Sequence, residues 1–141
     1  MASHPNAPGF GNVTTRYVRV AEVRVEMTLD TRTEADGRGR LILHVHGDVD
    51  LGTETLLGAA LTEALADRAV REVVVDLAGV PFLDSTGVRV LLEGRRTALA
   101  RGAALTVRNP RRVVHHVLQV TGVAEALGLP VARDGDEPTR G

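Results

Sequence analysis

The amino-acid sequence predicts a single α/β domain on a mixed, mostly parallel sheet of four to five strands. Two observations carry this prediction. The chain has 141 residues, the size of one domain. Strand and helix patterns follow one another in the order β-β-α-β-α-β-α. Strands joined through helices run parallel with right-handed crossovers, so we expect an N-terminal hairpin, then parallel strands, with helices mainly on one face.

Neither end of the chain shows a periodic pattern. Residues 1–16 are rich in Pro, Gly, Asn and Thr, and residues 133–141 have a similar composition. Such segments are typical of mobile termini. We therefore expect a mobile N-terminal arm over residues 1–16, one domain over residues 17–132 and a mobile C-terminal tail over residues 133–141.

The first two strands are predicted from alternation. Apolar and polar residues alternate over residues 18–27, residues 34–39 form a turn-like cluster, and the alternation resumes over residues 41–45. Two such runs separated by a turn predict an antiparallel hairpin. In the second run, His44 and His46 lie on the face opposite the apolar residues.

Helices and buried strands then alternate. Residues 56–65 carry apolar side chains at helical spacing, with Asp50 and Thr53 as candidate N-caps. The β-branched run at residues 73–77 predicts a buried strand. A second helix follows, with Val88 at the start of its apolar stripe, and residues 104–107 form the next strand. We expect Asn109 to cap a third helix and Gly122 to end it.

Composition excludes several classes of protein. The chain has no cysteine and no lysine, which excludes cysteine zinc sites, disulfide scaffolds and lysine-based catalysis. Its net charge of −1 gives no reason to expect a nucleic-acid partner. No apolar run is long enough to span a membrane, and the N-terminus lacks the pattern of a signal peptide. We expect a soluble cytoplasmic protein.

Two segments at strand ends carry candidate chemistry. Residues 80–89 (VPFLDSTGVR) lead into a helix, where free N–H groups and the helix dipole favour an anion such as phosphate near Ser85. Asp84 and Ser85 are equally explained as helix caps, and Gly87 by close packing. Residues 47–53 (GDVDLGT) hold Asp48 and Asp50 at the preceding strand end. Parallel strands place both segments on one rim, which predicts that Asp50 and Ser85 are neighbours.

These segments, in this order, resemble a STAS domain, and more narrowly the bacterial anti-sigma-factor antagonists. The resemblance covers residues 20–130 and rests on G-D-V-D at residues 47–50, V-V-V-D-L at 73–77 and F-L-D-S-T-G-V at 82–88. It implies a STAS-like fold and a regulator that is not an enzyme and needs no cofactor. The expected partner-binding residues are Asp50, Asp84, Ser85, Thr86, Gly87, Val88 and Arg89.

The resemblance also implies a phosphorylation switch. Ser85 is the expected phospho-acceptor, and the partner is an anti-sigma factor that is itself a serine kinase. The unphosphorylated antagonist binds this kinase and frees a sigma factor, so it acts in transcription regulation by partner switching, as in stress responses. A serine phosphatase reverses the modification. We expect a monomer or weak dimer with no direct nucleic-acid or membrane partner.

One residue departs from the family pattern. Arg89 stands where the family usually has a small residue, one helical turn after Ser85. It either pairs with a phosphate on Ser85 or obstructs the usual partner contact.

Other interpretations remain open. Asp48 and Asp50 resemble the aspartates of haloacid-dehalogenase-type phosphotransferases, which use Mg²⁺. The chain could instead be a STAS subunit of a larger signalling or transporter-associated assembly, which need not accept phosphate at Ser85. His44 and His46 could chelate a metal, but with no cysteine and no assured third ligand we expect no metal site.

Overall fold

The computed structural model describes the backbone of residues 12–20 and 23–130 and the side chains of residues 28–130. In this part of the chain the elements follow in the order β1 (Asn12–Val20), β2 (Val23–Ala35), β3 (Arg40–His46), α1 (Glu54–Ala66), β4 (Glu72–Gly79), α2 (Ser85–Ala100), β5 (Ala104–Arg108) and α3 (Arg112–Val120).

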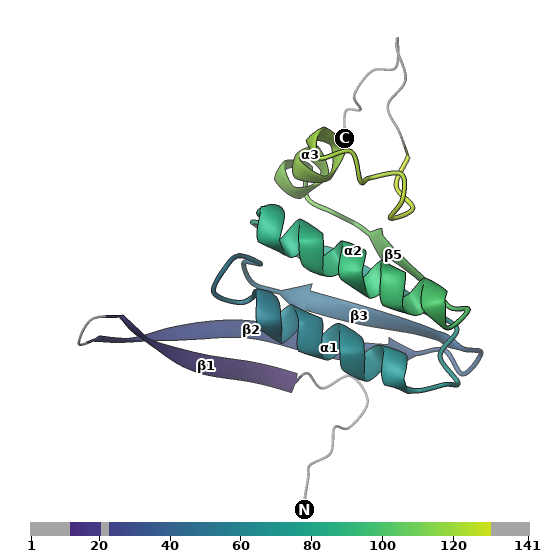
Figure 1. Cartoon of the computed structure of the whole chain (residues 1–141), viewed down its shortest axis with the longest axis horizontal. Coiled ribbons are helices and arrows are strands. Elements are labelled where there is room, and N and C mark those ends of the chain that lie inside the picture. Colours follow the sequence, from purple (N-terminus) through teal and green to yellow (C-terminus); the bar gives the residue numbers. More distant parts are fainter. Residues whose placement is uncertain (1–11, 21–22, 131–141) are drawn as a thin grey trace, which may run out of the picture.

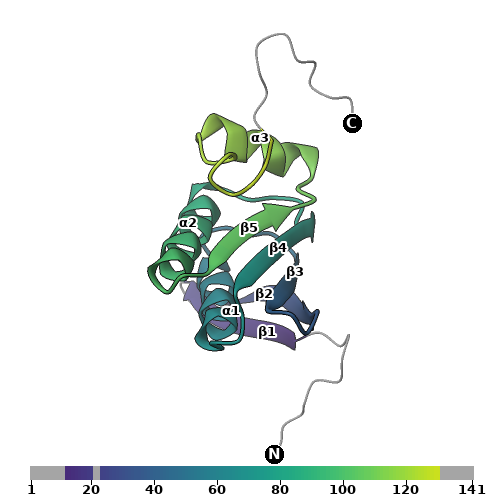
Figure 2. The ribbon, with the colours of Figure 1, turned by 90° about the vertical axis from the view of Figure 1, so that its right-hand side faces the viewer.

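The five strands form one mixed sheet in the spatial order β1-β2-β3-β4-β5. The sheet runs from β1 in the N-terminal hairpin to β5 on the side of α3 (Figure 1), and all five strands are labelled in Figure 2. β1 with β2 and β2 with β3 pair antiparallel, whereas β3 with β4 and β4 with β5 pair parallel. The predicted α/β class, the N-terminal hairpin and the mixed sheet are therefore confirmed. The pairings divide evenly rather than being mostly parallel, because the first predicted strand is in fact two strands.

The N-terminal hairpin differs from its prediction. β1 pairs with β2 along its whole length, from Asn12 opposite Thr31 to Val20 opposite Val23. The arm that the sequence predicts as mobile over residues 1–16 includes residues 12–16, which belong to strand β1 of the sheet. The rest of that arm and the predicted tail at residues 133–141 lie outside the described residues.

Helices α1 and α2 cover one face of the sheet, and α3 lies beyond the edge formed by β5 (Figure 2). Alternate residues of the strands face these helices and are fully or almost fully buried, as the apolar spacing predicts. The buried side chains include Leu43, Val45, Val73, Val75, Leu77, Leu105 and Val107 from the strands and Leu57, Leu61 and Leu91 from the helices. This core holds the carboxyl ends of β3 and β4 side by side.

The third helix begins later than predicted. Its N-cap is Arg111, so the prediction that Asn109 caps this helix is wrong. Asn109 instead adopts a left-handed backbone conformation, with φ of 56°, and its side chain contacts a strand. The predicted stop is confirmed: Thr121 is the C-cap, and Gly122 follows with φ of 78°.

Candidate functional site

The segments after β3 and β4 are joined by their backbones. Val49 and Leu83 form an isolated parallel bridge. The Val49 N–H donates to the Phe82 carbonyl at 2.9 Å, and the Asp84 N–H donates to the Val49 carbonyl at 3.2 Å. The segment that holds Asp50 therefore lies beside the segment that leads into Ser85. We call the exposed surface of these two segments, residues 48–52 and 81–86, the rim.

Asp84 caps helix α2. Its Oδ1 accepts the Thr86 N–H at 3.0 Å, the Gly87 N–H at 3.2 Å and the Thr86 hydroxyl at 2.6 Å. Burial alone would raise the pKa of the Asp84 carboxyl, but these donors outweigh it and hold that pKa below its usual range. Asp84 is therefore an anion that already occupies the first donors of α2.

Ser85 is the first residue of α2, and it is exposed. Within the described residues, no hydrogen bond occupies its hydroxyl. Thr86, the adjacent hydroxyl, is partly buried and donates to Asp84. Of these two neighbouring hydroxyls, only that of Ser85 is free to meet another molecule.

Asp50 organises the entry into α1. Its Oδ1 accepts the N–H groups of Gly52 at 3.0 Å and Thr53 at 3.2 Å. Thr53, the N-cap residue, is buried, and its hydroxyl donates to the Asp48 carbonyl at 2.7 Å. Asp50 thus shapes its own loop, and its half-buried carboxylate still adds negative charge to the rim.

Two of the predicted partner-binding residues are buried. Val88 is 5 % exposed. Gly87 is also buried, and a Cβ atom there would lie 2.8 Å from Val49 Cγ1 and 3.0 Å from Leu83 Cγ. These two residues pack α2 against the segment after β3, so little of their surface is exposed. Their contact with a partner stays a prediction.

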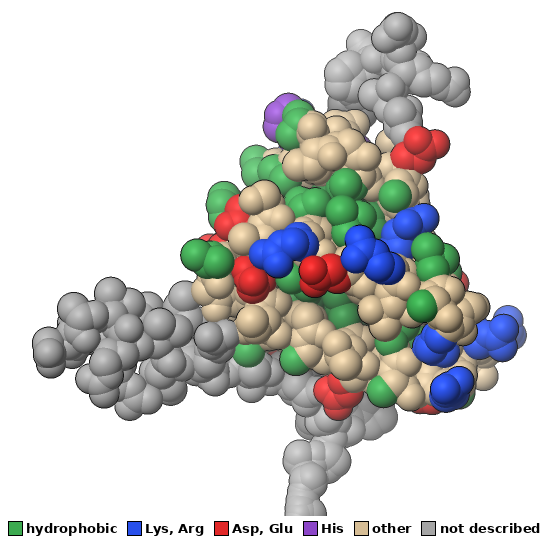
Figure 3. Space-filling view, viewed as in Figure 1, with side chains coloured by type: hydrophobic (Ala, Val, Ile, Leu, Met, Phe, Trp, Pro, Cys, Tyr) green, Lys and Arg blue, Asp and Glu red, His purple; other side chains and the backbone are tan. Residues whose placement is uncertain are grey.

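Arg89 points away from the core and has a partner on the neighbouring helix. Its side chain is 57 % exposed, and Nη2 lies 3.8 Å from Oε2 of Glu54 in the first turn of α1. The pair lies along the junction of α1 and α2, where acidic and arginine side chains alternate (Figure 3).

The sequence analysis missed two exposed apolar residues on the rim. Leu51 is 74 % exposed and Phe82 is 46 % exposed. Both stand on the rim with Ser85, so their apolar surface is available to a protein partner that binds there. In the sequence they stand in the same loops as the buried residues Val49 and Leu83, so no local signal separates the exposed apolar residues from the buried ones.

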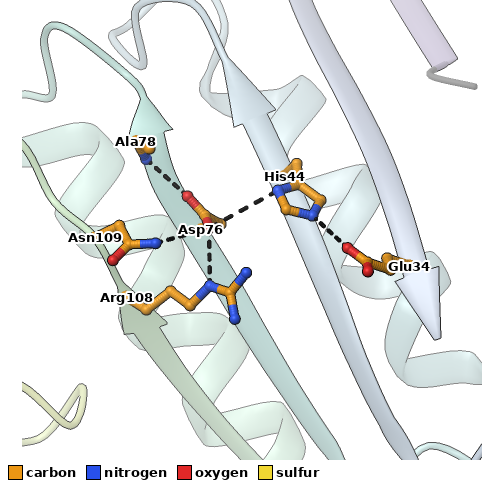
Figure 4. Close-up of polar contacts among 6 residues, drawn as sticks. All are labelled: Glu34, His44, Asp76, Ala78, Arg108 and Asn109. Atoms are coloured by element: carbon orange, nitrogen blue, oxygen red, sulfur yellow. Dashed lines mark hydrogen bonds and ion pairs between the residues drawn. The ribbon is translucent and has the colours of Figure 1, made fainter. Parts of the chain in front are cut away.

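A second polar cluster crosses the face of the sheet opposite α1 and α2 (Figure 4). Its centre is Asp76 in β4, which is only 6 % exposed. Asp76 Oδ2 accepts Arg108 Nε at 2.8 Å and Asn109 Nδ2 at 3.1 Å, and Oδ1 accepts the Ala78 N–H at 2.9 Å. Burial raises the pKa of Asp76, but these donors together lower it below its usual range.

His44 extends this cluster to β2. Its Nε2 lies 2.9 Å from Glu34 Oε1, and its Nδ1 lies 3.8 Å from Asp76 Oδ2. His46 lies on the same face at the end of β3, and Gly79 leaves room for it, because a Cβ at Gly79 would collide with the imidazole. Among the residues with described side chains, no group of three His, Cys, Asp or Glu residues is arranged to hold a metal ion.

No helix in the described residues is both long and apolar enough to cross a bilayer.

Comparisons with known proteins agree with this fold. The family model described as "Mlab, STAS domain" matches residues 33–130. An anti-sigma F factor antagonist of Paenibacillus polymyxa is 28 % identical over 92 residues, or 65 % of this chain and 79 % of that protein. The anti-sigma-F factor antagonist RsfB of Mycobacterium tuberculosis is 39 % identical over 61 residues, or 43 % of this chain and 49 % of that protein.

A solved structure gives the same result for the architecture. The anti-sigma factor antagonist SpoIIAA in its unphosphorylated form superposes with a TM-score of 0.61 at 22 % identity, covering 74 % of this chain and 89 % of that chain. The family match begins at residue 33, so β1 and most of β2 precede it. Because the match spans most of the chain, from the end of β2 through α3, this protein belongs to the STAS domain family.

Proposed function

We propose that this protein is an anti-sigma-factor antagonist whose partner is an anti-sigma factor with serine-kinase activity. The observation that carries the proposal is the position of Ser85: its hydroxyl is exposed and unoccupied at the start of α2, on a rim built by two joined loops. The names of the curated relatives support the same role. In this proposal the protein acts in the bacterial cytoplasm and frees a sigma factor by holding its inhibitor.

The proposed modification makes this chain a substrate and not a catalyst. The Ser85 oxygen attacks the γ-phosphorus of ATP held by the kinase, the hydroxyl proton leaves to a base of the kinase, and ADP departs. A serine phosphatase restores the hydroxyl when water cleaves the phosphate ester and inorganic phosphate is released. The antagonist itself needs no catalytic residue, metal or cofactor for either step.

Phosphorylation would change the rim by charge and bulk. Phosphoserine carries about −1.5 to −2 charges at neutral pH. It would stand next to Asp84 and near Asp50, both of which are held in place by hydrogen bonds within their own loops. A partner that packs against the unmodified rim would have to desolvate this added charge, which is costly unless the charge is fully paired. Unmodified protein therefore binds and modified protein dissociates.

A second candidate function is a STAS subunit of a larger assembly. It is favoured by the description of the matching family model, which names a STAS domain and not an antagonist. This alternative requires no phosphate on Ser85, so the same experiment separates the two functions.

The test uses each purified anti-sigma serine kinase of the source bacterium with ATP. We expect one phosphate, placed on Ser85 by mass spectrometry, and none on Ser85→Ala. Thr86→Val is the matched control, because it removes the neighbouring hydroxyl that donates to Asp84. Calorimetry should show that wild type and Ser85→Ala bind the kinase and that the Ser85 phosphoprotein does not. Phosphate on Thr86, or equal affinity of the modified and unmodified forms, would refute the switch.

A further inference from the structure

Arg89 has a position that the proposed switch does not yet explain. It lies four residues after Ser85 in α2, and residues with this spacing are neighbours on one face of a helix. Its side chain is more than half exposed, and its Nη2 lies 3.8 Å from Oε2 of Glu54. The contact is too long for a hydrogen bond and Arg89 is exposed, so Arg89 can leave Glu54 for a closer, charge-assisted contact.

Glu54, the ion-pair partner of Arg89 in this structure, is the more buried side chain of the two. The Glu54 side chain is only 16 % exposed, and its Oε1 atom is buried with no hydrogen-bond partner among the described residues. Glu54 and Arg89 both line a groove of about 350 Å³ between α1 and α2. When the pair breaks, the arginine is therefore the side chain that moves, and Glu54 remains at the groove.

A phosphate on Ser85 would need a cation close by. Two N–H groups in the first turn of α2, those of Thr86 and Gly87, are already taken by the Asp84 carboxylate. That carboxylate would also repel the phosphate, because both are negative. The next arginines of α2 are Arg95 and Arg96, which lie about 15 Å or more along the helix from Ser85.

We propose that Arg89 is the phosphate-binding residue of the modified Ser85, and that it leaves Glu54 to bind the phosphomonoester. This inference rests on the proposed function, since it requires a phosphate on Ser85. A guanidinium matches two phosphate oxygens in a forked, charge-assisted contact that Glu54 does not receive in the unmodified protein. Modification at the rim then also changes the groove, where Glu54 loses its cation.

The test places phosphoserine at position 85 during protein synthesis, so that it needs no kinase. The second ionisation of the phosphate is followed by ³¹P NMR as a function of pH. A bound guanidinium favours the dianion, so the phosphate pKa in the otherwise wild-type protein should lie below that in Arg89→Gln by about 0.3 to 0.7. Arg89→Lys should restore part of this difference, because it keeps the charge but not the fork.

Two further variants separate the contact from general charge effects. Arg96→Gln removes the same charge from α2 at a distance, and it should leave the phosphate pKa nearly unchanged. Glu54→Gln removes the competing carboxylate and should lower that pKa further. Thermal unfolding of each variant shows whether the fold is intact.

Two results would overturn the proposal: an unchanged phosphate pKa in Arg89→Gln, or an equal shift in Arg96→Gln. Either would leave the switch itself standing. Conversely, a kinase that never modifies Ser85 would defeat the proposed function without altering the ³¹P result.

Discussion

Asp76 and Asp84 both have pKa values below the usual range, but their hydrogen-bond partners come from different parts of the chain. Asp76 lies in β4, almost fully buried, and its side-chain partners Arg108 and Asn109 are 32 and 33 residues away in the sequence. Asp84 lies on the rim, partly buried, and among the described residues its Oδ1 accepts hydrogen bonds from Thr86 and Gly87, the next residues along the chain. The Asp76 cluster joins segments that are far apart in the sequence, whereas the Asp84 contacts all form within one helical turn.

This difference indicates where the domain can change without losing its fold. The Asp76 cluster fixes β4 against β5 and holds the left-handed turn at Asn109 that leads into α3. The Asp84 side chain is held by donors in the first turn of α2. The Ser85 hydroxyl, on the outer side of the rim, takes no part in these contacts. A site built by local contacts on a rigid core can accept a charge while the core stays intact.

The largest effect on stability is expected from Asp76→Ala. The substitution removes the acceptor for Arg108, Asn109 and the Ala78 N–H, and it should lower the free energy of unfolding by about 2–3 kcal/mol in urea denaturation. Glu34→Ala is the control from the same cluster, and we expect little change because the Glu34 side chain is 58 % exposed. Equal losses from both variants would contradict a cluster centred on Asp76.

The same variant has a defined pH dependence. The pKa of Asp76 is lowered by folding, so its stabilising effect is present above the unfolded value of about 3.9. It is lost as the pH falls through the lower, folded pKa. The difference in unfolding free energy between wild type and Asp76→Ala should therefore be constant near neutral pH and shrink below about pH 4. A difference that grows in acid would show that Asp76 is not an ionised acceptor.

Sequence reasoning succeeded where the signals were local. Three features depend only on residues close together in the sequence: the apolar–polar alternation of the strands, the helical spacing of the core leucines and the helix cap at Asp84. The adjacency of the two loops also followed, because parallel strands fix where their ends lie. The cluster at Asp76 was not predictable, since it depends on which residues meet across β3, β4 and β5. For the same reason the sequence predicts a helix cap at Asn109 where the structure has Arg111, and nothing in the sequence marks Leu51 and Phe82 as exposed.

An intermediate effect is expected where the rim meets the core. Gly87→Ala would place a Cβ 2.8 Å from Val49 Cγ1, and this overpacking should cost about 1–3 kcal/mol of unfolding free energy. Gly58→Ala in α1 is the matched change, because its Cβ would meet nothing closer than 3.8 Å. Alanine is the better helix former by about 0.5–1 kcal/mol, so this variant should be more stable than wild type. Urea denaturation of the two variants should therefore give opposite signs, and a stabilised Gly87→Ala would refute the close approach.

The smallest effect on stability is expected on the outer side of the rim. Leu51 is three-quarters exposed, so Leu51→Ser should change the unfolding free energy by no more than about 0.5 kcal/mol. If the proposed function is correct, the same change should weaken binding of the anti-sigma kinase at least about tenfold, because apolar side chains near the centre of an interface carry much of its energy. Phe82→Ser should act in the same direction with a slightly larger loss of stability, since Phe82 is half-buried.

Leu99→Ser is the matched control for that last comparison, because Leu99 is also exposed, at 52 %, but lies near the opposite end of α2 from Ser85. Calorimetric titration of the kinase with each variant gives the affinity, and urea denaturation gives the stability. Asp48, Asp50 and Asp84 lie in the same two rim segments as the two apolar residues. The partner should therefore present an apolar group together with basic or donor side chains, and binding should weaken with added salt. If Leu51→Ser and Phe82→Ser lose no more affinity for the kinase than Leu99→Ser, the partner does not contact the rim. The Asp84 cap would then contribute only to the stability of α2.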